Sequence, residues 1–309
     1  MHIGLSRPPT PPHPVPDLDG ALVAQIAERL GFESLFYGEH PITPVNDPGK
    51  LVHSSGVPFF QDTLVMLARA SAVTSRIRLG SAVFLLPIHQ PVLFAKQLAS
   101  LDFYSGGRLI VGAGFGWSRV ETEVMGGNFD RRWAQAREAV QLMKKLWTDD
   151  IAEFHGEFFT VPPVRLFPKP AQTPWPPVLL ASPADGGVSV SSDKAVRAFR
   201  RIVVYGDGWL PAFIGRARMH AGVAEVEKGR KVLDGLCVQA GRDPAELQVC
   251  ALLRTETHDG TVGWPEVPDR GILRMYEDIG VERVIVTIPT LTDEKQAERV
   301  LTRLAGELL

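Results

Sequence analysis

Cysteine is scarce in this chain of 309 residues. Only Cys237 and Cys250 occur, no Cys-x-x-Cys pair is present, and the histidines form no cluster at metal-ligand spacing. A disulfide framework or a structural zinc site needs several such residues at short, regular spacing. The sequence therefore predicts no disulfide scaffold and no metal site.

An excess of charge of one sign is also absent. The chain has 33 basic and 35 acidic residues, a net charge of −2, and 45% hydrophobic residues. Nucleic-acid-binding proteins normally carry a basic excess, a membrane helix needs about 18 consecutive apolar residues, and a secretory signal needs a charged and then an apolar N-terminal region. None of these is present, so we expect a soluble cytoplasmic protein with no nucleic-acid or membrane partner.

Short apolar or β-branched runs alternate along the chain with longer segments of helical period. This alternation is typical of βαβ units and a parallel sheet. The expected strands span residues 2–5, 34–37, 77–83, 109–112, 178–181, 208–210, 247–253 and 284–288. The expected helices span residues 18–30, 62–73, 91–104, 131–147, 194–203, 218–240, 269–279 and 293–304.

Eight strand-then-helix units in a chain of this length predict one α/β domain over residues 1–309, a (β/α)8 TIM barrel. A doubly wound sheet is the second interpretation. Residues 41–60 and 149–177 exceed what simple connections need. Loops that follow barrel strands build the active-site face, so we expect residues 41–60 to form a pocket wall there. The other segment contains a small hairpin that turns at His155-Gly156.

Glu39 and His40 directly follow the second expected strand, at the end where barrel active sites form. A histidine at this place can exchange a proton or hydrogen-bond a cofactor ring, because its ordinary pKa lies near neutrality. A polar pair that merely caps a loop fits the same position. The sequence leaves both interpretations open.

The segment 112–117 (GAGFGW) directly follows the fourth expected strand. Glycines let backbone N–H groups approach a phosphate closely, although a tight turn also needs them. The segment is not the dinucleotide-binding fingerprint, since Trp117 stands at its sixth position. At the end of the third strand, Phe84, Leu85 and Leu86 are candidates for an apolar pocket wall or for ordinary core packing. A nucleophile elbow, a Walker loop and a His-Glu-x-x-His helix are all missing.

Taken in order, several stretches together resemble the bacterial luciferase-like superfamily, closest in style to its F420-dependent oxidoreductases. The resemblance covers about residues 1–215 and depends on order and spacing more than on one motif. The stretches are 31–40 (GFESLFYGEH), 74–83 (TSRIRLGSAV), 105–109 (SGGRL), 112–117 (GAGFGW), 155–159 (HGEFF), 168–170 (PKP) and 207–209 (DGW), with Glu138 between them.

The resemblance implies a flavin or deazaflavin ring over the barrel mouth, with its phosphate held outside. The residues implied to bind this cofactor are Ser81, Ala82 and Val83 at the third strand, with a cis peptide at Ala82-Val83, then Gly112, Gly114, Phe115 and Gly116, and then Ala181 and Ser182 after the fifth strand. His40 maps to the residue near the reactive ring, where it would hold a proton, and Glu39 is expected to orient it. A homodimer is implied as well.

Three functions follow from the resemblance. An F420-dependent oxidoreductase that transfers a hydride to or from a small organic substrate comes first. An FMN-dependent monooxygenase that uses molecular oxygen comes second, and a non-catalytic barrel subunit third. A glucose-6-phosphate substrate is rejected, because Trp117 stands where that branch places a catalytic acid.

The turn after the fifth strand departs from the family pattern. The family usually has two glycines there that contact the phosphate, whereas this chain has Ala181 and Ser182 followed by Pro183, with Gly186-Gly187 only later. Backbone N–H groups at Ala181 and Ser182 can still donate, but proline has none to offer.

Overall fold

The computed structural model describes residues 1–7, 18–44, 60–182, 192–214, 217–254 and 267–309. Most of the expected pocket wall (residues 45–59), Pro183 and Gly186-Gly187 lie outside the described residues. No helix in the described part of the chain is long and apolar enough to cross a membrane.

Eight parallel strands close into a barrel, which confirms the (β/α)8 prediction and excludes the doubly wound alternative. Each strand pairs in parallel with its neighbour, and pairings of β1 with β11 and of β3 with β5 complete the circle. The barrel strands are β1 (His2–Arg7), β2 (Ser34–Tyr37), β3 (Arg78–Ser81), β5 (Leu109–Gly114), β8 (Val178–Ser182), β9 (Gly208–Ile214), β10 (Gln248–Arg254) and β11 (Arg283–Thr287). A two-residue strand, β4 (Phe84–Leu85), extends the contact with β5.

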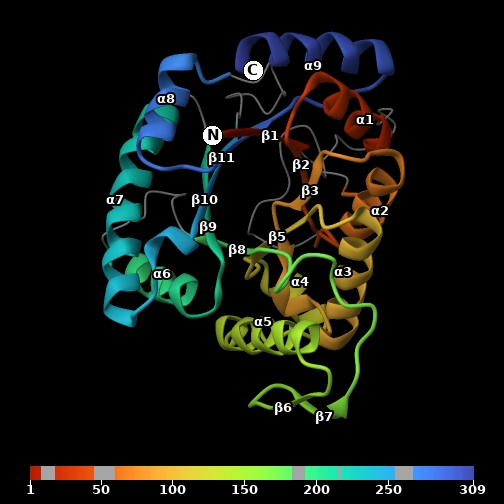
Figure 1. The fold of residues 1–309 in the computed structure, drawn as a ribbon, viewed down its shortest axis with the longest axis vertical. Helices are drawn as coiled ribbons and strands as arrows, with labels where there is room; N and C mark the ends of the chain where they lie inside the picture. The colour runs from red at the N-terminus through yellow and green to blue at the C-terminus, as the bar shows by residue number, and fades with distance from the viewer. Residues whose placement is uncertain (8–17, 45–59, 183–191, 215–216, 255–266) are drawn as a thin grey trace.

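Helices surround the barrel, with α9 along the top of Figure 1, α5 along the bottom, α7 at the left and α2 and α3 at the right. Asp19 and Asp62 accept hydrogen bonds from the first-turn N–H groups of α1 and α2, and Gly31 ends α1 with a φ of 97°. The helices are α1 (Gly20–Leu30), α2 (Thr63–Val73), α3 (Pro91–Ser105), α4 (Arg119–Val124), α5 (Arg132–Thr148), α6 (Asp193–Tyr205), α7 (Ala217–Ala240), α8 (Arg270–Asp278) and α9 (Glu294–Leu308).

The expected hairpin is present and lies beyond α5. It consists of β6 (Ala152–His155) and β7 (Thr160–Val164), which pair antiparallel. The carboxylate of Glu138 on α5 is buried and accepts hydrogen bonds from the N–H groups of Glu157 (2.9 Å) and Phe158 (2.8 Å) in the turn. Glu138 therefore fastens the hairpin to the barrel wall.

The barrel interior has an ionic floor and an apolar middle. At the start of β11, Arg283 is 1% exposed, donates two hydrogen bonds to Glu33 (2.7 and 2.6 Å) and approaches Cys250 Sγ at 3.3 Å. Above it, apolar side chains from neighbouring strands pack together: Phe36, Ala82, Ile110, Leu179, Leu210, Cys250, Leu252 and Ile285. This layer blocks the barrel, so a ligand can enter only from the end where the strands finish.

Candidate functional site

On the mouth side of the apolar layer, the strands carry small residues. Side chains two positions apart share one face of a strand. Gly38, Gly112, Ala181 and Thr287 thus lie one step toward the mouth from Phe36, Ile110, Leu179 and Ile285. The Thr287 hydroxyl is buried and has no hydrogen-bond partner among the described residues. The glycines let neighbouring backbone approach closely, and the Thr287 hydroxyl offers a polar group to a ligand at the barrel mouth.

His40 lies at this mouth, just past the end of β2, and is held by a buried carboxylate. Its Nδ1 lies 3.1 Å and 3.0 Å from the two carboxylate oxygens of Glu121. The Glu121 side chain is 1% exposed and that of His40 is 12% exposed. A carboxylate accepts a hydrogen bond from the Nδ1–H group and fixes the ring orientation. Nε2 is then the nitrogen that is free to exchange a proton with a ligand.

Two aromatic side chains enclose the imidazole. The rings of Phe60 and Trp117 contact it edge to face, with centroids 4.9 Å and 5.6 Å away. Phe60 also lies within 4 Å of the position that a Cβ on Gly38 would take. The imidazole of His40 therefore has apolar rings on two sides. Such surroundings favour proton exchange with a bound ligand over exchange with bulk water.

The expectation that Glu39 orients His40 is wrong. The Glu39 carboxylate is buried, accepts a hydrogen bond from the Leu85 N–H (2.7 Å) and lies 3.0 Å from His89 Nε2. Side chains of consecutive residues in an extended segment point to opposite sides, so Glu39 turns away from the mouth that His40 faces. Glu39 instead fixes the segment after β3 against β2.

Glu121 was missed because no helix was expected between residues 118 and 125. The signal for one is nevertheless present, since Ser118-Arg119-Val120-Glu121 has the spacing of a capping box. Ser118 Oγ does accept from the Glu121 N–H at 3.2 Å, as the motif predicts. The Glu121 side chain reaches His40 rather than the start of its own helix. Because the Glu121 side chain contacts His40 and does not cap its own helix, we infer a functional role for it.

The peptide bond between Ala82 and Val83 is cis, as the resemblance implied. Glycines on β5 make room for this segment. A Cβ on Gly112 would lie 1.9 Å from the Ser81 carbonyl oxygen, and one on Gly114 would lie 2.4 Å from Val83 Cγ2. Close packing against Ser81 and Val83 by itself explains why glycine stands at these two positions. Their contact with a cofactor phosphate stays a prediction.

The remaining predicted cofactor residues also lie near the mouth. Phe115 is buried and stacks on Trp133 of α5 with centroids 3.9 Å apart, and Gly116 has a φ of 69°. Ala181 is half-buried on β8, next to β9, and Ser182 ends β8. The topology therefore brings the ends of β2, β3, β5 and β8 together, while the individual contacts with a cofactor stay predictions.

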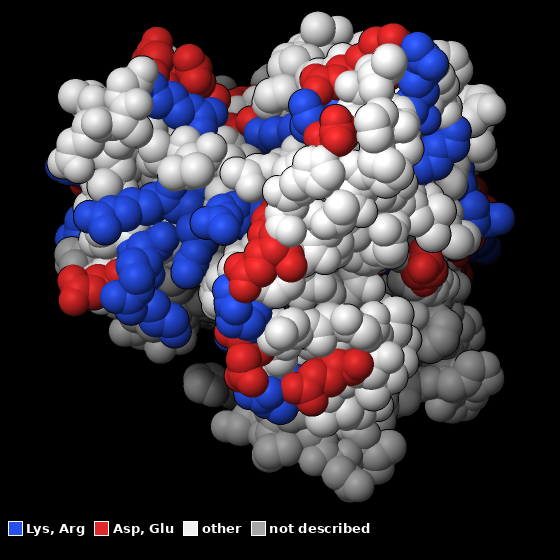
Figure 2. Space-filling model, turned by 90° about the horizontal axis from the view of Figure 1, so that it is seen from below, with Lys and Arg blue, Asp and Glu red and all other residues white. Residues whose placement is uncertain are grey.

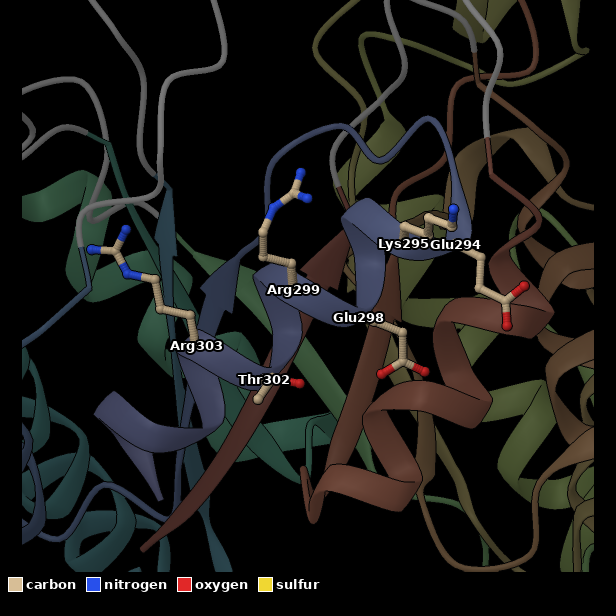
Figure 3. A pocket seen from close by; sticks show the side chains of 6 residues that line it. All are labelled: Glu294, Lys295, Glu298, Arg299, Thr302 and Arg303. Atoms are coloured by element: carbon tan, nitrogen blue, oxygen red, sulfur yellow. The ribbon is translucent and has the colours of Figure 1, made fainter.

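Features elsewhere on the described surface point to no other active site. A shallow cavity of about 800 Å³ lies on the outer face of α9 (Figure 3), lined by Glu294, Lys295, Glu298, Arg299, Thr302 and Arg303. Its lining is a charged helix surface on the outside of the barrel. Among the described residues, no group of three or more His, Cys, Asp or Glu side chains is placed to hold a metal ion.

Comparison with known proteins identifies the family. A family model described as luciferase-like monooxygenase matches residues 19–260. The chain belongs to the luciferase-like monooxygenase family. An uncharacterized protein of Mycobacterium tuberculosis (strain H37Rv) is 32% identical over 295 residues, which is 93% of each chain. Members of this family are flavin- or deazaflavin-dependent oxidoreductases and monooxygenases, so the chain is an enzyme of this type.

Two solved structures share the fold of this luciferase-like chain. Monooxygenase RslO1 from Streptomyces bottropensis aligns with a TM-score of 0.73 and 20% identity, over 100% of this chain and 98% of that one. An F420-dependent secondary alcohol dehydrogenase, in complex with an F420-acetone adduct, aligns with a TM-score of 0.71 and 15% identity over 98% of both chains. At these identities the likeness concerns the fold alone.

The mouth of the barrel fits the cofactors of the family. The side chain at Ala181 is small, and the Thr287 hydroxyl, which has no partner among the described residues, can bond a ring carbonyl or ring nitrogen. His40, held by Glu121, lies at the same end of the barrel. A flavin and a deazaflavin share this ring shape, so ring fit does not separate them.

Proposed function

We propose that this luciferase-like enzyme is an F420-dependent oxidoreductase that moves a hydride between the deazaflavin and a small organic substrate. The observation that carries the proposal is the His40–Glu121 pair at the barrel mouth, within its apolar enclosure. A bound deazaflavin would supply the hydride donor or acceptor. The similarity of fold to an F420-dependent dehydrogenase supports the choice.

The protein's part in such a reaction is to orient the reactants, exclude water and handle one proton. Oxidation of an alcohol to a carbonyl by loss of hydride also releases the hydroxyl proton. In this proposal His40 Nε2 accepts that proton, and in the reverse direction returns it. Glu121 is a positioning residue, since its carboxylate accepts a hydrogen bond from Nδ1 and fixes the orientation of the ring.

An FMN-dependent monooxygenase is the alternative, supported by the description of the family and by the likeness of fold to monooxygenase RslO1. Titration of the purified protein with F420 and with FMN, followed by cofactor fluorescence under identical conditions, separates the two. We expect F420 to bind more tightly. Tighter binding of FMN would favour the monooxygenase instead. If neither cofactor bound, both functions would be rejected.

The role of the His40–Glu121 pair is tested by removing the imidazole and, separately, by neutralising the carboxylate. With a substrate that reduces F420, His40→Ala should lower kcat by about 10²–10⁴-fold, the usual range for a general acid or base. Glu121→Gln should lower kcat by about 10–100-fold with little change in the cofactor dissociation constant or KM. Glu123→Gln is the matched control, because Glu123 lies on the same helix and is half-exposed beside Arg119. An unchanged kcat in Glu121→Gln would show that the pair is only structural.

A further inference from the structure

A concentration of positive charge lies on the outer surfaces of α5 and α6. Figure 2, which looks onto the side of the molecule where α5 lies, shows basic side chains gathered at the left, where α6 and α7 lie in Figure 1, with acidic side chains beside the cluster. The basic residues that α5 and α6 place on adjoining faces are Arg132, Arg137, Lys194, Arg197, Arg200 and Arg201. We call these six residues the basic patch.

The basic patch lacks the ion pairs that several other arginines form, although the charge of Asp130 acts on Arg132. None of its six members forms an ion pair with a described residue, whereas Arg119, Arg131, Arg230 and Arg242 all do. Asp193 on the same helix is exposed and pairs with none of them. Because the whole chain carries a net charge of −2, this is a local concentration and not a general excess. Unpaired like charges repel, so a bound anion would relieve them.

The base of the patch contains buried donors without acceptors. Arg132 Nε and the Tyr205 hydroxyl are buried and have no hydrogen-bond partner in the described part of the chain. Arg201 and Arg137 lie close enough to Tyr205 to interact with it electrostatically. Burial lowers the pKa of the Arg201 guanidinium, and the nearby charges of Arg197 and Arg132 lower it further. Unsatisfied buried donors among cations are what an anion site requires.

The patch is continuous with the barrel mouth. Arg201 lies over the ring of Trp133, 4.2 Å from its centroid, and Trp133 stacks on Phe115. Phe115 follows the last residue of β5, at the same end of the barrel as His40. Phe115, Trp133 and Arg201 therefore form a path from the rim to the patch.

We propose that the basic patch binds the anionic tail of the deazaflavin cofactor. The inference rests on the proposed function and extends it from the ring to the rest of the ligand. F420 carries a phosphodiester followed by a chain of glutamates, so it presents several negative charges beyond its ribityl chain, whereas FMN ends in a single phosphate. Six cations on two adjacent helices, none of them in an ion pair with a described residue, match a multiply charged tail better than one phosphate.

The test compares two ligands that share the ring. F420 carries the tail, and its tail-less deazariboflavin precursor carries only the ring and the ribityl chain. Dissociation constants for both are measured by fluorescence at low and high salt, on the wild type and on Arg197→Glu/Arg200→Glu. Both residues are exposed, so the change should leave the fold intact. Lys295→Glu/Arg299→Glu on α9, across the barrel, is the control with the same change of charge.

In the wild type we expect F420 to bind more tightly than the precursor, by a margin that shrinks as salt screens the charges. The α6 double variant should weaken F420 binding by about tenfold or more and leave precursor binding unchanged, since exposed ion pairs contribute up to about 1 kcal/mol each. The α9 variant should change neither. Equal binding of the two ligands in every protein would overturn the tail site and leave the proposed function standing. Failure of both ligands to bind the wild type would overturn both proposals.

Discussion

Replacement of Gly112 by alanine tests whether the close contact between β3 and β5 shapes the barrel mouth. The added Cβ would lie 1.9 Å from the Ser81 carbonyl oxygen and 3.0 Å from its carbonyl carbon. Real Cβ atoms keep more than 3 Å from such atoms, so the two strands must separate by about 1 Å or more. The Ser81 hydroxyl, which donates to the Gly112 carbonyl at 2.8 Å, would be displaced as well.

The displacement falls on backbone in a closed barrel, where no flexible side chain can give way. Overpacking of this kind typically costs 1–3 kcal/mol, and we expect the upper end, about 3 kcal/mol. At about 2–4 °C per kcal/mol, the melting temperature should fall by about 6–12 °C. Since Ser81 immediately precedes the Ala82-Val83 segment, affinity for the cofactor ring should fall too.

Gly235→Ala provides the contrast. Gly235 is an exposed residue of α7, and a Cβ there meets nothing within 4 Å. Alanine should stabilise this helix by about 0.5–1 kcal/mol because it restricts the unfolded chain. Thermal and denaturant unfolding of both variants, with fluorescence titration of the cofactor, checks the pair. If Gly112→Ala unfolded like the wild type and bound cofactor equally well, the β3–β5 contact could not be what shapes the site.

Three further predictions concern the rest of the barrel. Burial alone would raise the pKa of Glu33, but the hydrogen bonds and charge of Arg283 outweigh burial and hold that pKa below its usual value. The Glu33–Arg283 pair therefore stabilises the fold at any pH above the pKa of Glu33 in the unfolded chain. This stabilisation is lost as the pH falls through the lower pKa that Glu33 has in the folded protein. Glu33→Gln should cost about 3–5 kcal/mol near neutral pH, and urea unfolding at a series of pH values should show the difference shrink in acid. Burial raises the pKa of the Cys250 thiol to about 11 and also raises the pKa of the Cys237 thiol. Neither thiol should therefore react with iodoacetamide at pH 8 until the protein is unfolded. Labelling of either cysteine in the native protein would contradict the packing around it. Glu138→Ala removes the acceptor of two turn N–H groups and should speed proteolysis within the β6–β7 hairpin, as mass spectrometry of early fragments would reveal.

Much of the barrel could be predicted from local patterns, because its repeating units are signalled locally. The strand expected at 34–37 is β2 as observed, and the helix expected at 91–104 is α3 to within one residue. Less regular segments were harder. The strand expected at 77–83 is observed only over Arg78–Ser81, and β4 begins at Phe84. The period of apolar residues does not report such an interruption.

The candidate site could be predicted in position but not in its contacts. His40 was found because it follows a barrel strand, and position along the chain is enough for that. Its partner Glu121 lies 81 residues later on a helix of six residues, and no local pattern connects the two. Glu39, the neighbour in sequence, points elsewhere. Proximity along a strand is thus a poor guide to which carboxylate serves a histidine at a barrel mouth.

The closure of the barrel has a consequence for its biosynthesis. β1 leaves the ribosome before the other barrel strands, and one of its two neighbours, β11, begins only at Arg283. Until that segment emerges, β1 and β10 each keep one open edge with unpaired backbone groups, and such edges can pair with other chains. Nearly the whole barrel must be made before both edges are covered. The nascent chain is therefore most exposed to aggregation late in translation, and shielding at that stage would protect it best.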